Sequence, residues 1–301
     1  MNPYIISIAE ELKIHFLDDT KLLQEVSIFL CGGSGANEFQ FRRELGAEIS
    51  KTVSKHKYSV YYPEDMFIEL ILGHQRENLL TLENLLADSV NAVVILLQSP
   101  GTFAELGAFA NYEKLKNKLI VVINPKFAHA KSFINLGPIR YLRQNSKSTV
   151  LLSPMDSTNL KSLTKQIADE ARAVGKYSSV VRDLSNPIWS YRFCLALIYV
   201  FDPIPKRAIF LITRHFWNKD TRILDIATET VINSLISERK VFPNSGNISM
   251  TSKGLHYLIY HHETKRKARK ISDLLTQLRL DALNLTLRKE HRRVWGEAEG
   301  S

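Results

Sequence analysis

The sequence predicts an α/β protein in which a doubly wound parallel sheet is followed by a mainly helical region. Three observations predict this class. In the first half of the chain, short apolar runs rich in β-branched residues alternate with segments of helical spacing. The apolar runs are continuous, which is typical of strands covered on both faces. After about residue 150, long segments of helical spacing replace the strand-like runs.

The first half contains the elements of an open sheet. Strands are expected over residues 26–31, 58–62, 91–97 and 118–123, and helices over 39–53, 79–90 and 103–115. Strand, helix and strand in this order imply parallel strands joined by right-handed crossovers. Ligands of such sheets bind beyond the carboxyl ends of the strands, so chemistry is sought there.

The second half indicates helices closed by a hairpin. Helices are expected over residues 160–173, 206–216, 221–227 and 228–240, and residues 240–258 predict strand, turn and strand. Three helices followed by a hairpin is the order of a winged helix-turn-helix. The chain from residue 261 has helical spacing and basic clusters. We therefore expect a sheet domain at 1–155, a helical connector at 156–188 and a winged-helix domain with a basic terminal helix at 189–301.

Charge is distributed unevenly along the 301 residues, whose net charge is +9. Residues 1–150 carry 16 basic and 16 acidic side chains, whereas residues 151–301 carry 24 basic and 15 acidic ones. A basic second half predicts a polyanionic partner, and nucleic acid is favoured over a membrane surface. No apolar run approaches the roughly 18 residues needed to span a bilayer.

The remaining compositional signals exclude several classes. The first 16 residues contain acidic side chains and no basic region of the kind that opens a signal peptide, so a cytoplasmic protein is expected. Cys31 and Cys194 lie in different halves and have neither disulfide nor zinc-site spacing, so no metal is expected. The glycines after the first strand lack the Gly-Lys-Ser/Thr of a Walker motif and G-x-G-x-x-G spacing.

Three predicted strand ends carry unusual residues. The candidates for substrate contacts are Cys31, Gly32, Gly33, Pro63, Ser99, Gly101 and Thr102. Glycines let backbone donors approach a ligand closely, and the two hydroxyl groups can add contacts. Thr102 is expected to cap the next helix, with Glu105 in its first turn. The alternative is that Thr102-x-x-Glu105 is a capping box, in which Glu105 only returns a hydrogen bond to the backbone.

Carboxylates at neighbouring strand ends fit cleavage of a glycosidic bond. Its transition state resembles an oxocarbenium ion, so a carboxylate such as Glu105 can attack or shield C1′ while another group handles the leaving base. Glu64 and Asp65 are the candidates for that second role. The alternative for this Pro-Glu-Asp turn is a solvated loop or a helix cap.

At these residues the sequence resembles the nucleoside 2-deoxyribosyltransferase fold, in which the glutamate of an E-L-G helix attacks C1′ of a nucleoside. The resemblance rests on the segment S-P-G-T-F-A-E-L-G-A-F at 99–109. With IFLCGG at 28–33, YYPEDMF at 61–67, LLTLENLLADSV at 79–90 and KSFINLGPIRYLR at 131–143, the chain is similar to retron effectors that join such a domain to a DNA-binding domain.

The resemblance implies a toxic antiphage effector, held in check by a reverse transcriptase and its multicopy single-stranded DNA, in a homo-oligomer or higher assembly. Its activity would be N-glycosidic cleavage of a nucleotide, with NAD as a candidate substrate, no separate cofactor, and Glu105 as nucleophile. Transferases of this fold place an Asp six residues before that Glu, where this chain has Ser99. Hydrolysis is therefore expected over transfer to an acceptor base.

Two alternatives stay open for the sheet domain. The P-G-G-x-G-T-x-x-E pattern of phosphoribohydrolases is a poorer match, since only P-G-T-x-x-E is present at 100–105. A nucleotide-sensing DNA-binding regulator that binds without turnover is the other.

In the helical half, residues 228–240 are predicted to form a recognition helix. The candidate nucleic-acid contacts are Thr230, Asn233, Ser234, Ser237, Arg239, Lys240, Lys253, Lys265, Arg266, Lys267, Arg269 and Lys270, and Arg292 and Arg293 are further candidates. Many winged helices bind protein instead, Glu229 repels phosphate, and the basic runs fit a solvated helix face equally well.

Overall fold

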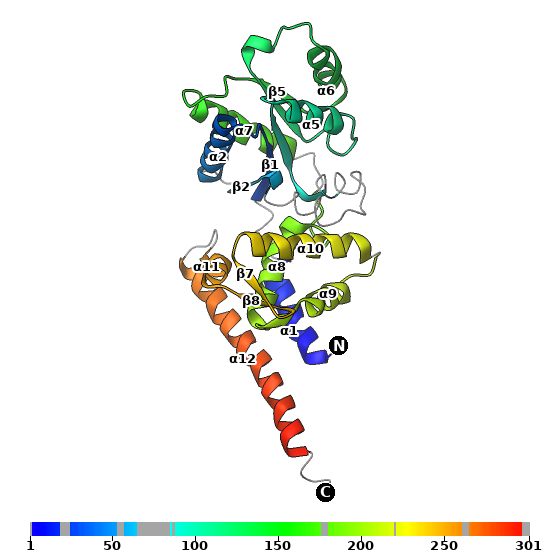
Figure 1. Cartoon of the computed structure of the whole chain (residues 1–301), viewed down its shortest axis with the longest axis vertical. Coiled ribbons are helices and arrows are strands. Elements are labelled where there is room, and N and C mark those ends of the chain that lie inside the picture. Colours follow the sequence, from blue (N-terminus) through cyan, green and yellow to red (C-terminus); the bar gives the residue numbers. More distant parts are fainter. Residues whose placement is uncertain are drawn as a thin grey trace. The chain divides into compact units, whose positions relative to one another are not determined.

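The computed structural model describes residues 2–18, 25–52, 57–64, 85, 88–175, 180–219, 221–260 and 265–296 (Figure 1). In the last helix, side chains are described only to 285 and at 287. The chain forms two compact units. One consists of Thr20–Val181 and the other of Met1–Asp19 together with Arg182–Ser301. Each unit is described by itself below.

The first unit is built on a five-stranded parallel sheet. Its strands are β1 (Glu25–Cys31), β2 (Lys57–Tyr61), β3 (Ala92–Leu96), β4 (Leu119–Ile123) and β5 (Thr149–Leu152), in the order β2-β1-β3-β4-β5. Register runs from Glu25 beside Lys57 to Ile123 beside Leu152. The four expected strands are confirmed. The fifth was not predicted, because its four residues lie at the sheet edge and are only partly buried.

Helices cover both faces of this sheet. Figure 1 shows α2 (Ala36–Lys51) and α7 (Leu160–Gly175) on one side, and α5 (Pro100–Ala110) and α6 (Arg140–Asn145) on the other. Successive residues of a strand point to opposite faces of the sheet, so each face is covered by a different set of side chains. On the first face, Ile28, Leu30 and Val94 pack against apolar residues of α2 and α7. The helix expected over 79–90 lies largely outside the described residues.

The strand order places a switch point between β1 and β3. From β1 the chain proceeds outward to β2, whereas β3, on the other side of β1, leads on to β4 and β5. At such a point the loops after neighbouring strands diverge and leave a crevice beyond their carboxyl ends. The residues that follow Cys31 and Leu96 therefore occupy the position where a ligand of this sheet is expected.

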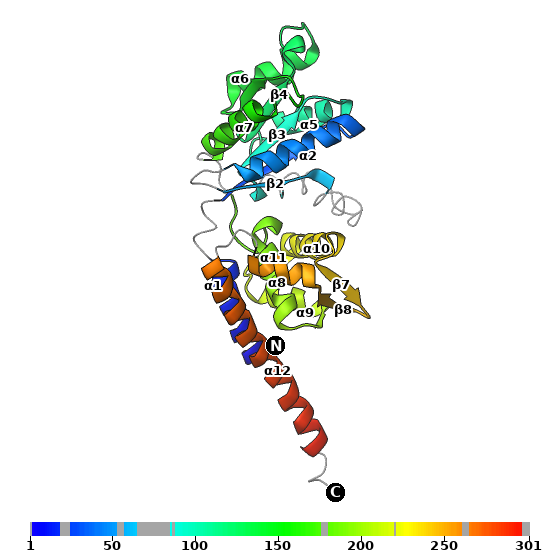
Figure 2. The same cartoon turned by 90° about the vertical axis from the view of Figure 1, so that its left-hand side faces the viewer.

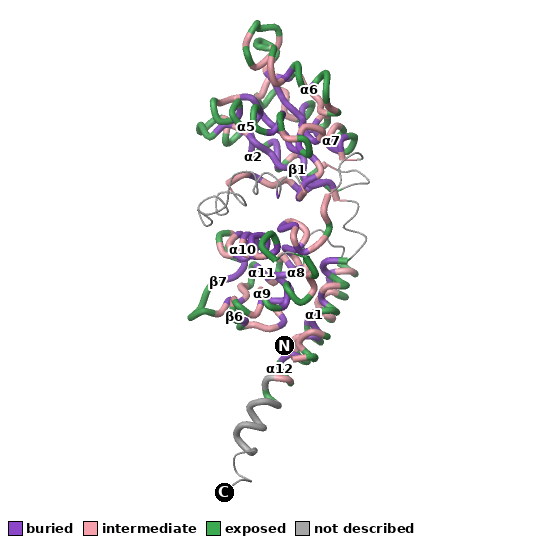
Figure 3. The backbone as a smooth tube through the Cα atoms, turned by 90° about the vertical axis from the view of Figure 1, so that its right-hand side faces the viewer, coloured by how far each residue is buried: buried purple, intermediate pink, exposed green. Residues whose placement is uncertain are grey.

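The second unit is organised around α8 (Pro187–Val200), a helix that is apolar on nearly all sides. Asn186 begins it by accepting hydrogen bonds from the backbone of Ile188 and Trp189. Residues 193–198 are completely buried. The helices α1 (Pro3–Phe16), α10 (Thr221–Ser237) and α12 (Lys265–Gly296) pack around it, as the buried core in Figure 3 shows.

A small antiparallel sheet completes this unit. It has the order β6-β8-β7, with β6 at Ile204–Pro205, β7 at Val241–Asn244 and β8 at Asn247–Met250. The expected hairpin is confirmed, with Gly246 in the left-handed region at φ 84°. Residues 221–237 form one continuous helix where two short helices were expected, and the chain after β8 forms α11 (Ser252–Tyr260), not part of a strand.

The two units divide the chain differently from the expected 1–155, 156–188 and 189–301. Helix α1 belongs with the helices, because Ile8, Leu12 and Phe16 are buried in the core formed with α8. Trp189 Nε1 also donates a hydrogen bond of 2.9 Å to the carbonyl of Leu17. Helix α7, assigned to a connector by its sequence, packs on β1, β3 and β4.

Helix α9 (Lys206–His215) contacts β6 and α10, and α11 contacts α8 and α12. Figure 2 shows both helices in this unit together with the β7–β8 hairpin. Within the described ranges, none of the helices combines the length and the apolar character that crossing a membrane requires.

Candidate active site at the strand ends

Glu105 lies on α5, directly after the carboxyl end of β3. The helix begins at Pro100, and its N-cap is Ser99, not Thr102. Ser99 Oγ accepts from the backbone N–H of Thr102, and Thr102 Oγ1 accepts from that of Ser99 at 3.1 Å. This pair is the capping box, so Glu105 has no part in it. The alternative in which Glu105 serves only as the capping-box partner of Thr102 is therefore wrong.

The Glu105 carboxyl is half-buried and partly unsatisfied. Its Oε2 atom is buried and has no hydrogen-bond partner among the residues that the structure describes. Burial raises the pKa of this carboxyl above its ordinary value of 4.5, while a hydrogen bond with the Cys31 thiol and the charge of Arg42 act in the opposite direction. A carboxylate held this way is a stronger base than a solvated one and has one oxygen free for a ligand.

Cys31 is the last residue of β1 and is completely buried. Burial raises the pKa of its thiol well above the ordinary value, and the negative charge of Glu105 adds to the effect. The thiol is thus protonated at neutral pH and acts as a hydrogen-bond donor, not as a nucleophile. The buried Cys31 thiol therefore lies beside the Glu105 carboxyl at the switch point of the sheet.

Arg42 brings a buried positive charge to the same edge from α2. Its side chain is 5% exposed, and its Nη2 lies 2.7 Å from Glu64 Oε1. Arg43 Nη2 contacts the same oxygen at 3.1 Å. The two guanidinium groups also stack near the ring of Tyr62, that of Arg43 at 3.9 Å from the ring centroid. Glu64 therefore forms ion pairs with both arginines through one carboxylate oxygen.

The glycine after β1 is required by this arrangement. A Cβ at Gly32 would lie 2.7 Å from Arg42 Cδ, so the absence of a side chain lets the arginine pass close to the strand end. A Cβ at Gly33 would meet Glu38 Cβ at 2.8 Å. Gly101, in contrast, is exposed on the first turn of α5, and a Cβ there would meet only Ser99 Oγ at 3.8 Å.

Within the described part of the chain, three buried polar atoms at this edge have no hydrogen-bond partner: Glu105 Oε2, Gln98 Oε1 and Arg42 Nε. Gln98 stands two residues after the end of β3. Buried polar atoms in folded proteins are almost always hydrogen-bonded, either within the protein or to a ligand or water. Two acceptors and a cationic donor at this edge are therefore available to an ordered water or to a polar ligand.

Substitutions at Arg42 and Glu64 are expected to shift the Glu105 pKa in opposite directions. Arg42→Gln is expected to raise the Glu105 pKa, because the cation that favours the ionised form is lost. Glu64→Gln is expected to lower it, because a repelling charge is removed. A carboxyl-resolved NMR titration measures both. Arg43→Gln serves as the control and should move the pKa little. Shifts in the same direction for the first two variants would contradict this assignment.

The other candidate contacts have mixed outcomes. Pro63 is half-buried and, like Glu64, has helical backbone, while Asp65 lies outside the described residues. The Ser99 and Thr102 hydroxyls, expected to contact substrate, are engaged in the helix cap, and Thr102 is buried. Arg42 was missed. A signal was present, since residues 41, 45 and 49 form the buried face of α2 and Arg42 adjoins that face in the second turn of the helix.

In the helical unit, the structure turns several candidate nucleic-acid contacts inward. Thr230, Ser234 and Lys240 are buried. The Thr230 hydroxyl donates to the carbonyl of Ile226, and Lys240 Nζ contacts Tyr191 Oη at 3.0 Å and lies 3.4 Å from the ring centroid of Tyr257. Burial lowers the pKa of this lysine, and Glu238 opposes that shift. These three residues belong to the core, so we no longer assign them to nucleic-acid contact.

The remaining candidates stay at the surface. Asn233 is half-buried, Ser237 and Arg239 are exposed, and Lys253 Nζ donates to the carbonyl of Glu238 at 2.8 Å. On α12, the candidates Lys265, Arg266, Arg269 and Lys270 are exposed and Lys267 is half-buried. The side chains of Arg292 and Arg293 lie outside the described part.

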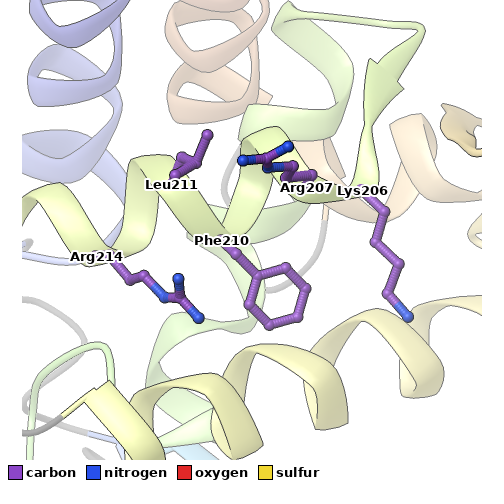
Figure 4. Close-up of a pocket in the computed structure, with 5 residues that line it drawn as sticks. All are labelled: Lys206, Arg207, Phe210, Leu211 and Arg214. Atoms are coloured by element: carbon purple, nitrogen blue, oxygen red, sulfur yellow. The ribbon is translucent and has the colours of Figure 1, made fainter. Parts of the chain in front are cut away.

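A basic hollow of about 370 Å³ lies along α9 in this unit (Figure 4). Its cations are partly neutralised, because Lys206 pairs with Glu229 at 2.6 Å and Arg214 forms a two-pronged pair with Asp225. Both carboxylates belong to α10. Figure 4 shows Lys206, Phe210 and Arg214 on one side of α9 and Arg207 and Leu211 on the other.

The parallel sheet and its strand-end cluster define an α/β protein with a buried carboxylate site at the switch point of the sheet. Comparison with known proteins gives the family. The chain matches the family described as "STM3845 retron effector protein" over residues 38–241, and it therefore belongs to this retron effector family.

Two curated relatives come from Escherichia coli. The chain is 32% identical over 277 residues to the "Retron Ec86 putative ribosyltransferase/DNA-binding protein", which covers 88% of this chain and 87% of the relative. It is 36% identical over 126 residues to the "Retron Ec73 putative ribosyltransferase/DNA-binding protein", covering 40% of this chain and 39% of the relative.

Proposed function

We propose that this retron effector acts in antiviral defence by cleaving the N-glycosidic bond of a nucleotide, with water as the acceptor. The observation that carries the proposal is the Glu105 carboxyl, which is excluded from the capping box and keeps a buried, unpartnered Oε2 at the strand switch point. The ribosyltransferase names of the two relatives describe the same class of bond. The substrate is NAD or a deoxynucleotide.

In this mechanism Glu105 acts on C1′ of the bound nucleotide. As the bond between C1′ and the base nitrogen breaks, its electron pair leaves with the base, and the ionised carboxyl bonds to or shields the developing cation. Water then attacks C1′, any bond between C1′ and the carboxylate oxygen breaks with its electron pair returning to the carboxylate, and the proton that the water loses passes to the solvent. The Cys31 thiol holds the carboxyl in place, and Arg42 favours its ionised form. Glu64 acts through Arg42, as a positioning residue.

Ser99 favours NAD among the candidate substrates. The nicotinamide of NAD carries a positive charge and departs as a neutral base, so it needs no proton from the protein. An adenine or guanine departs as an anion unless an acid protonates it. In related transferases, an Asp at this position is expected to handle that proton. This chain has Ser99 there, and the Ser99 hydroxyl is engaged in the helix cap. Release of nicotinamide therefore fits the residues better.

For the helical unit, we propose a winged-helix role in docking nucleic acid, as the DNA-binding names of the relatives suggest. Helices α8, α9 and α10 followed by the β7–β8 hairpin have the order of that fold. The exposed cations of α12 can meet phosphates. The partners proposed are the retron reverse transcriptase and its multicopy single-stranded DNA, which would control the activity within an oligomeric or higher assembly.

The test is an assay of base release by the purified chain, alone and assembled with its reverse transcriptase and DNA. NAD and the deoxynucleotides are each incubated with the protein, and free nicotinamide or base is separated and quantified. We expect nicotinamide release to exceed release from any deoxynucleotide. No product from any nucleotide in either state would overturn the proposal and favour a regulator that binds nucleotides without turnover.

A further inference from the structure

A second charge asymmetry lies inside the neutral half of the chain. Residues 1–113 contain 8 basic and 16 acidic side chains, whereas residues 114–155 contain 8 basic side chains and no acidic one. The net charge of residues 1–150 is zero, so it does not reveal this contrast. The basic stretch includes residues 125–145, here called the basic lobe, which follow β4 and end with α6.

The cations of the basic lobe surround a hollow of about 330 Å³. It is lined by His129, Lys131, Arg140 and Arg143, with Asn135 and Leu136 among the remaining lining residues. Lys131, Arg140 and Arg143 are exposed and form no ion pair within the part of the chain that the structure describes. The hollow along α9 differs in this respect, because Lys206 and Arg214 there are held by carboxylates.

Exposed aromatic side chains lie among these cations. Phe133 is 84% exposed and Phe127 is 63% exposed, while Tyr141 is exposed beside Arg140. Burying such rings in the core is the usual outcome of folding. Large rings separated by cations, in a stretch of sequence without acidic residues, do not resemble the apolar centre of a protein interface, which is depleted of charge. They resemble the combination of stacking platforms and cations that binds unpaired nucleic acid.

The lobe is also held in a defined shape. Asn135 Nδ2 donates hydrogen bonds of 2.8 Å to the carbonyls of both Phe127 and Ala130. Residues Asn135–Ile139 then form a π-helical turn that contains Pro138 and leads into α6. Turns of this kind are frequent at functional sites. The phenylalanine and the cations are thus presented on a loop that is already ordered by its own hydrogen bonds.

We propose that the basic lobe of the sheet unit binds single-stranded nucleic acid. Bases stack on Phe133, Phe127 and Tyr141, and phosphates pair with Lys131, Arg140 and Arg143. Stacking on exposed rings needs unpaired bases, so the lobe selects single strands over duplex. This surface is separate from the proposed contacts of the helical unit, and it requires no catalysis by Glu105.

The test measures binding of the full chain to a fluorescent oligo(dT) of about 20 nucleotides and to a duplex of equal length. Phe133→Ala is expected to weaken oligo(dT) binding about 5- to 100-fold, since stacking contributes roughly 1–3 kcal/mol per base. Duplex binding should stay within about twofold. Lys131→Glu with Arg143→Glu should also lower the salt slope of oligo(dT) binding by about 1.4, at roughly 0.7 per lost phosphate contact.

Lys161→Glu with Lys165→Glu is the matched control, because both lysines are exposed on α7 and the change of charge is the same. If this control weakens oligo(dT) binding as much as the lobe variant, or if Phe133→Ala has no effect, the proposal is wrong. Glu105→Gln should bind like the parent chain, which separates this test from that of the proposed activity.

Photocross-linking of the parent chain to a bromouracil-containing single strand locates the contact without substitution. Cross-linked peptides are expected from within residues 125–145. Cross-links confined to other segments would overturn the assignment, and specific capture of an acidic protein by the lobe without any single-strand binding would replace it with a protein interface.

Discussion

Glu105→Gln is expected to lower the rate of base release by on the order of 10³-fold or more, because the carboxamide can neither attack nor neutralise the charge that develops at C1′. Under the proposed toxic role, expression of the variant should not arrest growth. The substitution preserves size and one acceptor oxygen, so binding of the intact nucleotide should persist. The measurement is the single-turnover rate of base release by the variant and the parent chain.

The same substitution is expected to stabilise the fold at neutral pH. Since burial raises the Glu105 pKa in the folded chain, ionising the carboxyl destabilises the folded state. This cost is absent below about pH 4.5, the ordinary value, and is complete once the pH exceeds the raised pKa. The variant should therefore melt at a higher temperature than the parent at about pH 7.5, with the difference vanishing near pH 4.

Glu113→Gln is the matched control for both readouts. Glu113 follows α5, its side chain is 81% exposed, and it pairs with Lys116 at 2.7 Å. We expect parent-like rates and melting temperatures, because exposed ion pairs contribute little. Equal loss of activity in the two variants, or a Glu105→Gln variant that keeps the parent rate, would remove Glu105 from the mechanism.

Gly254→Ala is expected to have the largest effect on stability. The added Cβ would lie 2.1 Å from the backbone carbonyl oxygen of Lys240 and 2.6 Å from Met250 Sδ. That carbonyl is fixed, since it accepts from the backbone of Thr251 at 3.0 Å and from the Thr251 hydroxyl at 2.8 Å. Because the backbone cannot yield, we expect a loss of about 3 kcal/mol in the free energy of unfolding.

Denaturant unfolding of the full chain, followed by a probe of the helical unit, measures this loss. A decrease of about 10 °C in the melting temperature of that unit should accompany it. Gly107→Ala is the control, as Gly107 is also in a helix but a Cβ there would meet no atom within 4 Å. That variant should be neutral or gain about 0.5–1 kcal/mol from helix propensity. A stable Gly254→Ala chain would show that Gly254 does not lie against the Lys240 carbonyl and Met250 Sδ.

The sheet was predictable because its strands are buried on both faces and therefore appear as continuous apolar runs. The position of Glu105 followed from the same pattern, since the turn after β3 must lie at the carboxyl edge. Its cap was predicted wrongly. Both Ser99 and Thr102 can accept from a backbone N–H, and only the start of the helix at Pro100 decides between them.

Contacts between distant segments were beyond sequence reasoning. Helix α1 has the apolar spacing of any surface helix, and nothing local indicates that it packs against α8 nearly 200 residues later. The burial of the Thr230, Ser234 and Lys240 side chains could not be predicted either, because it also depends on how segments pack in the folded chain. Threonine, serine and lysine usually lie at the surface, and here each forms a hydrogen bond with its own helix or with a neighbouring segment.

Placement of the sugar relative to Glu105 tests the central claim most directly. The Glu105→Gln chain should bind an intact nucleotide, and a crystal structure of that complex locates C1′. We predict C1′ within about 3–3.5 Å of the side-chain oxygen of residue 105, the separation of a reacting pair. A nucleotide bound elsewhere on the sheet unit, or one with C1′ turned away from residue 105, would contradict the account.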